Sequence, residues 1–238
     1  MNALQAGCFF TVEEQNMTFD PVWDEIFRTQ AWGKYPGEDL IRFVAQNFYQ
    51  VPERSTVKIL EVGCGPGANL WYMAREGFSV YGVDGSATAI TRARTRLDSE
   101  CPGWNGELKV GDIARLDFAD GVFDAVIDNE AVYANSFESS VKIYDELARV
   151  CKPCGKLFSR TFAKGCWGDG TGISSGRNAW ISSEGPLKDK GLSRFTEFSE
   201  IPELIRGFEI RETELLTKTM ENRSREVREW LIVGEKIS

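Results

Sequence analysis

Residues 59–70 read ILEVGCGPGANL, a short apolar run followed by a turn with three alternating glycines and a helix-like segment. A buried strand that breaks into a glycine-rich turn is typical of a nucleotide-type ligand site, because glycine allows positive φ and close backbone approach. Gly63, Gly65 and Ala68 match the dinucleotide pattern G-x-G-x-x-A. Glu61 and the three glycines also form E-x-G-x-G-x-G, so the turn alone leaves two ligand classes open.

The chain from this turn onward alternates between strand and helix patterns. Strands are predicted at 57–63, 79–84, 106–113, 122–129 and 155–162. Helices are predicted at 67–77, 86–100 and 139–153. This alternation predicts an α/β fold with a Rossmann-like, doubly wound, mostly parallel sheet. Two later strand patterns, 208–217 and 227–237, are close in sequence and predict an antiparallel edge.

Two flanking regions are predicted to serve the ligand site. Residues 1–55 are predicted to form a helical cap or lid, and residues 56–238 the ligand-binding domain. The cap contains four aromatic residues that would line the lid or pack in its core: Trp23, Phe27, Trp32 and Tyr35. Residues 163–195, rich in Gly and Ser, follow a strand at the ligand-binding edge and are predicted to form a substrate loop.

Composition indicates which kinds of binding partner and which cellular location to expect. The net charge of −8 argues against a nucleic-acid partner, which needs a basic surface, and the basic run at 91–96 is predicted to be a solvated helix face. No apolar run is long enough to span a bilayer, so no membrane partner is expected. The N-terminus does not resemble a signal peptide, and the six cysteines lack framework spacing. We therefore expect a cytoplasmic protein.

The chain contains no histidine, which removes the commonest general base and the commonest metal ligand. Cys151 and Cys154 form a single C-x-x-C pair, whereas a zinc site needs about four ligands. We predict no metal site. Proton transfer must then rely on carboxylates, Tyr, Cys or Lys.

Acidic residues near the glycine turn help to choose its ligand. Asp84 ends the second predicted strand, where a carboxylate can bind the ribose hydroxyls of either ligand class. Glu61 would oppose a pyrophosphate but suits a cationic ligand. S-adenosylmethionine carries a sulfonium and an ammonium group and no phosphate, so it fits this position better than NAD.

Five ordered motifs extend the argument: EVGCGPG, VYGVDGS, GDI, FDAVIDN and CKPCGKL. Together, over about residues 57–161, they resemble the class I S-adenosylmethionine-dependent methyltransferases. This resemblance implies a seven-stranded sheet with the last strand inserted antiparallel, and S-adenosylmethionine as cofactor. A non-catalytic protein that binds the cofactor and an NAD-dependent oxidoreductase are the alternatives.

The resemblance also implies which residues bind the cofactor. The expected set is Glu61, Gly63, Gly65, Gly67, Asn69, Asp84, Gly85, Ser86, Asp112, Ile113, Asp128 and Asn129. The glycines, Glu61 and Asn69 would hold the methionine part. Asp84 would bind the ribose, and Asp112 the adenine amino group. The pair at 128–129 would border the sulfonium and the substrate.

Four further residues are candidates for catalysis. Glu130 and Tyr133 follow the fourth strand, where either could act as general base. Arg160 and Arg194 could clamp a carboxylate or phosphate of the substrate. The predicted reaction is methyl transfer to an O or N atom of a small-molecule acceptor, such as a sugar derivative.

Overall fold

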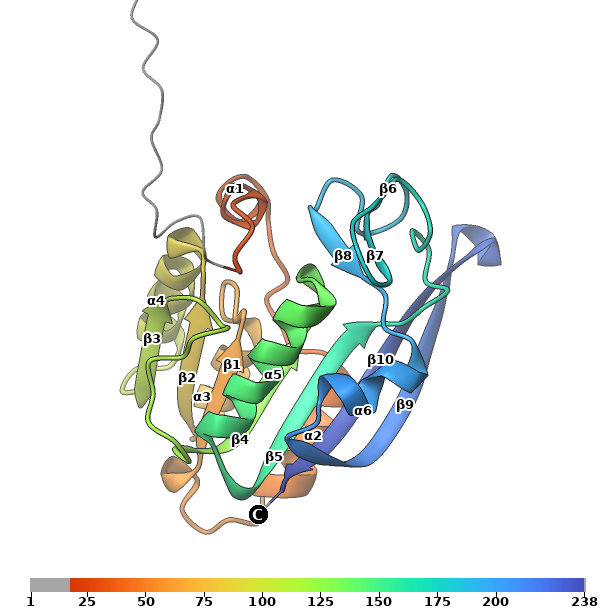
Figure 1. Cartoon of the computed structure of the whole chain (residues 1–238). Helices are drawn as coiled ribbons and strands as arrows, with labels where there is room; N and C mark the ends of the chain where they lie inside the picture. Colours follow the sequence, from red (N-terminus) through yellow and green to blue (C-terminus); the bar gives the residue numbers. More distant parts are fainter. Residues whose placement is uncertain (1–17, 238) are drawn as a thin grey trace, which may run out of the picture.

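The computed structural model describes residues 18–237, and a seven-stranded sheet forms its centre (Figure 1). The strand order is β3-β2-β1-β4-β5-β10-β9. The bounds are β1 (Lys58–Val62), β2 (Ser79–Asp84), β3 (Gly106–Val110), β4 (Phe123–Asn129), β5 (Cys151–Phe162), β9 (Phe208–Met220) and β10 (Arg225–Lys236). β1 to β5 are parallel, whereas β10 runs antiparallel between β5 and β9. The predicted Rossmann-like, mostly parallel sheet is confirmed.

Helices cover both faces of this sheet. The helices are α1 (Val22–Thr29), α2 (Glu38–Phe48), α3 (Ala68–Arg75), α4 (Ala87–Glu100), α5 (Phe137–Val150) and α6 (Ile201–Leu204), and α2 to α6 are the ones that pack on the sheet. Successive strand residues point to opposite faces, and Ile59 and Leu60 of β1 are both fully buried, in separate apolar clusters. The first cluster includes residues of α2, α3 and α4, and the second those of α5 and α6. None of the helices in residues 18–237 is long and apolar enough to cross a membrane.

The junction between α5 and β5 differs from the prediction. The helix was expected to continue to Pro153, but α5 ends at Val150, and β5 begins at Cys151. Proline disfavours the helical conformation in the residue before it, here Lys152, so a helix ends before the proline is reached.

The predicted substrate loop at 163–195 contains a second, small sheet. Three short antiparallel strands form it: β6 (Ile173–Ser174), β7 (Ala179–Ile181) and β8 (Leu192–Arg194). Strands of two or three residues carry too little alternation to be recognised from sequence. This sheet and α1 stand beyond the same end of the large sheet (Figure 1).

The predicted cap, residues 1–55, begins with residues 1–17, which lie outside the described residues. Its described portion contains α1 and α2. α2 packs into the core of the large sheet through Leu40, Phe43 and Val44. We call residues 18–37, which include α1, the lid segment.

Close packing between the start of β3 and strand β2 leads to a testable prediction about stability. Gly106 has φ +135°, and a Cβ added there would lie 1.7 Å from the carbonyl oxygen of Val80 on β2. Gly103 also has positive φ, but nothing lies within 4 Å of an added Cβ. We expect Gly106→Ala to lower the free energy of unfolding by about 3 kcal/mol, and Gly103→Ala by about 1 kcal/mol. Urea unfolding measures both, and equal losses would contradict the steric argument.

Candidate active site

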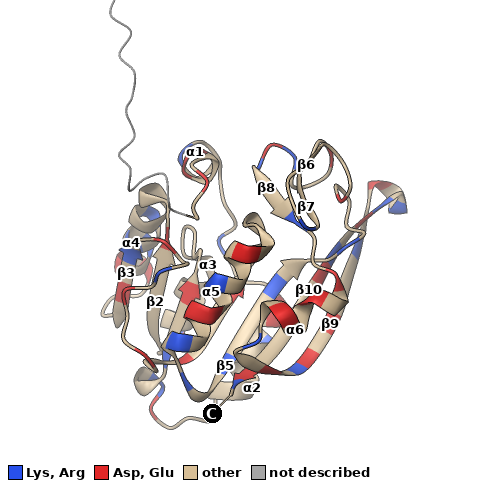
Figure 2. Ribbon diagram, viewed as in Figure 1, with Lys and Arg blue, Asp and Glu red and all other residues tan. Residues whose placement is uncertain are grey.

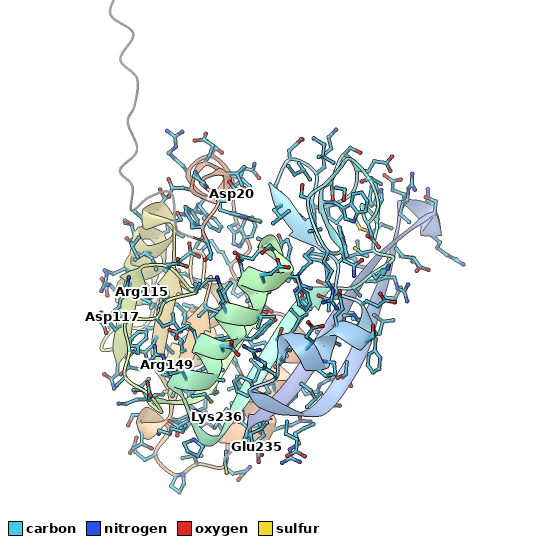
Figure 3. All side chains as sticks on the ribbon, viewed as in Figure 1. Asp20, Arg115, Asp117, Arg149, Glu235 and Lys236 are labelled. Atoms are coloured by element: carbon cyan, nitrogen blue, oxygen red, sulfur yellow. The ribbon has the colours of Figure 1, made fainter. Side chains whose placement is uncertain are left out.

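A cavity of about 460 Å³ lies at the carboxyl ends of β1, β2, β4 and β5. The glycine turn forms one wall, and the lid segment forms another. Residues 186–190, together with parts of β9 and β10, complete the lining. Figure 3 shows Asp20 of the lid segment at this end of the molecule, whereas Lys236 lies at the opposite end of the sheet. In open α/β sheets, ligands bind at this carboxyl end.

The glycine turn combines close packing with an open surface. Gly63 has φ +60°, and a Cβ added there would lie 2.3 Å from the Cβ of Ala131. Gly65 has φ +50°, and its added Cβ would lie 3.5 Å from Phe27 and 3.9 Å from Trp32. Gly63 therefore fits the turn against the end of β4, and Gly65 faces the aromatic residues of the lid segment.

Glu61 is a buried carboxyl group on the cavity wall. Its Oε1 accepts a hydrogen bond from Asn69 of α3, and its Oε2 has no partner among the described residues. Burial raises the pKa of Glu61 to about 8, and the charges of Asp84 and Asp128 add to this rise. A buried acceptor without a partner is costly unless a ligand supplies a donor or a positive charge. The site therefore fits the cationic cofactor expected from the sequence.

Asp84 joins the turns that follow β1 and β2. Its Oδ2 accepts from the backbone N–H of Gly65 at 2.8 Å, and its Oδ1 accepts from that of Ser86 at 2.8 Å. Burial raises the pKa of Asp84, although these hydrogen bonds act in the opposite direction. A carboxylate has about four acceptor positions, so this cavity-lining side chain can still accept from ribose hydroxyls.

The other expected cofactor residues divide into two groups. Residues that line the cavity, beyond those above, are Asn69, Gly85, Ile113 and Asn129. Residues outside its lining are Gly67, Ser86, Asp112 and Asp128. The cofactor contacts expected for this second group stay predictions.

The carboxylates of Asp112 and Asp128 accept hydrogen bonds from other residues of the protein. The carboxylate of Asp112 accepts from Ala114 N–H at 2.9 Å and from both the backbone and the hydroxyl of Thr18 in the lid segment. Asp128 accepts from the N–H groups of Ala131 and Val132 and from the hydroxyls of two further residues, Tyr144 and Ser159. Asp128 thus holds the turn after β4, and its neighbour Asn129 faces the cavity.

Glu130, Arg160 and Glu229 form a charged cluster on the cavity wall. Arg160 Nε lies 2.9 Å from Glu130 Oε1, and Arg160 donates to both carboxylate oxygens of Glu229, at 3.0 and 2.6 Å. Glu130 has φ +59°, a conformation that non-glycine residues adopt mainly where structure or function requires it. Burial and the nearby charge of Glu229 raise the pKa of Glu130 to about 7.

The sequence analysis missed Glu229. It lies on β10, on the same face as buried Leu231, two residues further along the strand. A charged residue on the buried face of a strand was the available signal. The antiparallel pairing of β10 with β5 brings Glu229 beside Arg160, and no local pattern reports that pairing.

Tyr133 lines the cavity and packs edge-to-face against Phe162, with ring centroids 4.7 Å apart. Burial raises the pKa of Tyr133 well above its usual range. The phenol therefore stays protonated at neutral pH and can donate a hydrogen bond. Of the two residues predicted as possible bases, Glu130 has the suitable proton affinity.

The two arginines predicted to clamp an acidic substrate lie in different places. Arg160 lines the cavity, but two carboxylates already hold its guanidinium. Arg194 is fully buried outside the cavity lining and donates to Thr196. Its guanidinium lies 5.9 Å from the ring of Phe137, and burial lowers its pKa. Neither arrangement resembles an open anion clamp.

Comparison with known proteins identifies the family. The family model of the methyltransferase domain matches residues 59–155. A methyltransferase of Schizosaccharomyces pombe, described as uncharacterised, is 30% identical over 106 residues, which cover 44% of this chain and 72% of the relative.

The chain is a class I S-adenosylmethionine-dependent methyltransferase.

Two further comparisons match a larger part of this methyltransferase than the family model does. A tRNA N(3)-methylcytidine methyltransferase of the same yeast is 26% identical and covers 91% of this chain and 90% of its own length. A solved S-adenosylmethionine-dependent methyltransferase from Methanosarcina mazei has a TM-score of 0.65 at 22% identity, and covers 82% of this chain and 97% of that chain. S-adenosylmethionine is therefore the cofactor, and nothing supports the NAD-dependent or non-catalytic alternatives.

The tRNA-modifying relative corrects one prediction. The net charge of −8 was taken to argue against a nucleic-acid partner, yet a relative matched along almost the whole chain acts on tRNA. Net charge sums the whole molecule, whereas phosphate binding depends on the local field of one surface. The prediction that a nucleic-acid partner is unlikely was therefore wrong.

The proton on Glu61 gives a pH-dependent prediction for this methyltransferase. Because the pKa of Glu61 is about 8 in the cavity, the group is mostly protonated at pH 7. A cationic ligand beside it favours the carboxylate, so binding of S-adenosylhomocysteine, which carries the same ammonium group, should release roughly one proton at pH 7.

Calorimetric titration in two buffers of different ionisation enthalpy measures that proton. The release should decline as the pH rises above 8, where Glu61 is already ionised. Glu61→Gln is the matched control, because the amide cannot ionise and its binding enthalpy should not depend on the buffer. Buffer-independent binding by the unmodified protein would contradict the prediction.

Proposed function

We propose that this methyltransferase transfers the methyl group to an O or N atom of a small molecule, such as a sugar derivative, and that Glu130 acts as general base. The observation that supports this is the cluster of Glu130, Arg160 and Glu229 on the cofactor cavity. A base works best when its pKa lies near the operating pH, and the pKa of Glu130 is about 7.

In this proposal, each residue around the cavity has a separate role in the reaction. The bound cofactor supplies a methyl group on a sulfonium, a leaving group that needs no further activation. Glu130 would accept the proton of the acceptor hydroxyl or ammonium group, which leaves a lone pair on that oxygen or nitrogen free to take the methyl group. Arg160 holds Glu130 in place, and Tyr133 can donate a hydrogen bond to the acceptor. Phe27 and Trp32 shield the glycine turn from water.

The charge of the cluster favours an acceptor that brings hydrogen-bond donors. Arg160 carries one positive charge between two carboxylates, so the three ionised side chains together carry a net negative charge. A carboxylate or phosphate would add repulsion beside Glu130 and Glu229. Hydroxyl or amino groups would instead donate to these side chains, which supports a polyol or an amine as acceptor.

A nucleotide of tRNA is the second candidate acceptor. The relative that acts on tRNA aligns with 91% of this chain, which a shared cofactor domain alone does not require. A base nitrogen would enter the same aromatic cavity.

We also propose a cytoplasmic location. Among residues 18–237, the thiols of Cys64, Cys101, Cys151 and Cys166 are free and buried. Reduced thiols are typical of proteins from reducing compartments.

Radiolabelled S-adenosylmethionine with fractionated metabolites, sugar derivatives, amines and total tRNA tests the proposal. With the acceptor found, we expect Glu130→Gln to lower turnover by about 10²–10⁴-fold, because the amide cannot accept the proton. The affinity for S-adenosylhomocysteine should change little. The turnover of the unmodified enzyme should rise with pH through about 7, as Glu130 becomes deprotonated.

Glu138→Gln is the matched control, since Glu138 is exposed on α5 and lies outside the cavity lining. Equal turnover by the two variants would exclude Glu130 as the base. Methylation confined to tRNA would replace the small-molecule acceptor by the second candidate.

A further inference from the structure

The basic run at 91–96 contacts the lid segment. Arg92 and Arg96 lie four residues apart, on one side of α4. Arg92 Nη1 donates to the backbone carbonyls of Phe27 and, at 3.3 Å, of Gln30. Arg96 Nη1 donates to the carbonyl of Lys34. Figure 2 shows α4 with blue segments near α1. The run is therefore more than the solvated face predicted from sequence.

Arg94 belongs to the same run but has a different partner. Its guanidinium donates to the carbonyl of Leu108 on β3, at 3.0 Å. It makes no hydrogen bond with the lid segment among the bonds within residues 18–237. Arg94 therefore provides a matched comparison for Arg92, because it is an arginine on the same helix without a hydrogen bond to the lid segment among residues 18–237.

The contact is reciprocal, because the lid segment also caps α4. Asp24 of α1 accepts from the hydroxyl of Ser86 and from both the N–H and the hydroxyl of Thr88, each at 3.2 Å. Ser86 is the N-cap residue of α4. A carboxylate at a helix N-terminus is favourable, as is a guanidinium on the last carbonyls of a helix. Each of the two helices thus satisfies an end of the other.

α1 depends on this support. It has eight residues, and isolated helices of that length are not stable in water. Phe27, whose carbonyl Arg92 binds, lies in the last turn of α1, and its ring faces Gly65. Loss of Arg92 would release the turn that carries this part of the cavity wall.

The lid segment is linked to the cofactor turns by a continuous chain of hydrogen bonds. Asp24 binds the hydroxyl of Ser86, whose N–H binds Asp84, and Asp84 in turn accepts from Gly65. Phe19 covers the adjoining turn, since a Cβ added to Gly85 would lie 2.2 Å from its Cγ. The lid segment and the cofactor site are therefore held by the same residues.

We propose that Arg92 is a positioning residue that holds the lid segment against α4, and that release of this contact sets the rate at which the cofactor product leaves the cavity. The proposal concerns the cofactor side of the cavity and does not rest on the identity of the acceptor or on the role of Glu130.

Dissociation of S-adenosylhomocysteine tests the proposal. The protein is loaded with the radiolabelled ligand, and its release is followed after an excess of unlabelled ligand is added. We expect Arg92→Ala to accelerate release about tenfold, through loss of charge-assisted hydrogen bonds. Arg92→Lys retains a donor and should restore release to within about threefold of the unmodified protein. Arg94→Ala should release the ligand at the unmodified rate.

Limited trypsin digestion separates movement of the lid from general unfolding. Arg28 and Lys34 are exposed sites within the lid segment. We expect Arg92→Ala to be cut faster after these two residues, with S-adenosylhomocysteine restoring protection, while Arg94→Ala is cut like the unmodified protein. Unchanged release by Arg92→Ala would overturn the proposal. Equal acceleration by Arg92→Ala and Arg94→Ala would also overturn it, since the effect would then come from loss of any α4 arginine.

Discussion

The carboxylate of Asp84 holds together the part of the molecule on which the rest of the site depends. By accepting from Gly65 and Ser86, it fixes the turn after β1 relative to the turn after β2. Ser86 then caps α4 and binds Asp24, so the lid segment takes its position from the same carboxylate. A buried acid is costly unless donors satisfy it, and here the backbone N–H groups of the turns after β1 and β2 are the donors.

The reaction side of the cavity depends instead on strand order. β4, β5 and β10 are neighbours in the sheet, and they supply the end of β4, Arg160 and Glu229 to one wall. Because β10 runs antiparallel, a residue near its beginning lies beside the carboxyl end of β5. An additional parallel strand in that place would present the opposite end of its sequence. The inserted strand therefore contributes an acidic side chain to the cavity wall.

The chain contains no histidine, and burial raises the pKa of two carboxyl groups on the cavity wall. Glu61 and Glu130 both line the cavity, and their pKa values lie near neutrality for related reasons. The pKa of Glu61 is raised mainly by desolvation. Its Oε2 atom has no hydrogen-bond partner among the described residues, which suits a cationic cofactor. The pKa of Glu130 is raised by desolvation and by the charge of Glu229. The Glu130 side chain also forms an ion pair with Arg160. One residue type thus serves binding in one half of the cavity and, as we propose, catalysis in the other.

The sequence by itself determined the fold class, because that depends on local patterns, and it indicated the cofactor through the resemblance of five ordered motifs to a known family. Alternating strands and helices specify a doubly wound sheet, and the stretch 59–70 with Asp84 specifies a cradle at its carboxyl edge. Only the tertiary structure decided which distant side chains meet on the cavity wall beside β4, β5 and β10. Glu229 lies far along the chain from Glu130, Arg194 is buried outside the cavity lining, and Arg92 binds the lid segment rather than solvent. These outcomes depend on which distant strands and helices pack together, and contacts between residues far apart leave no periodic pattern in either segment.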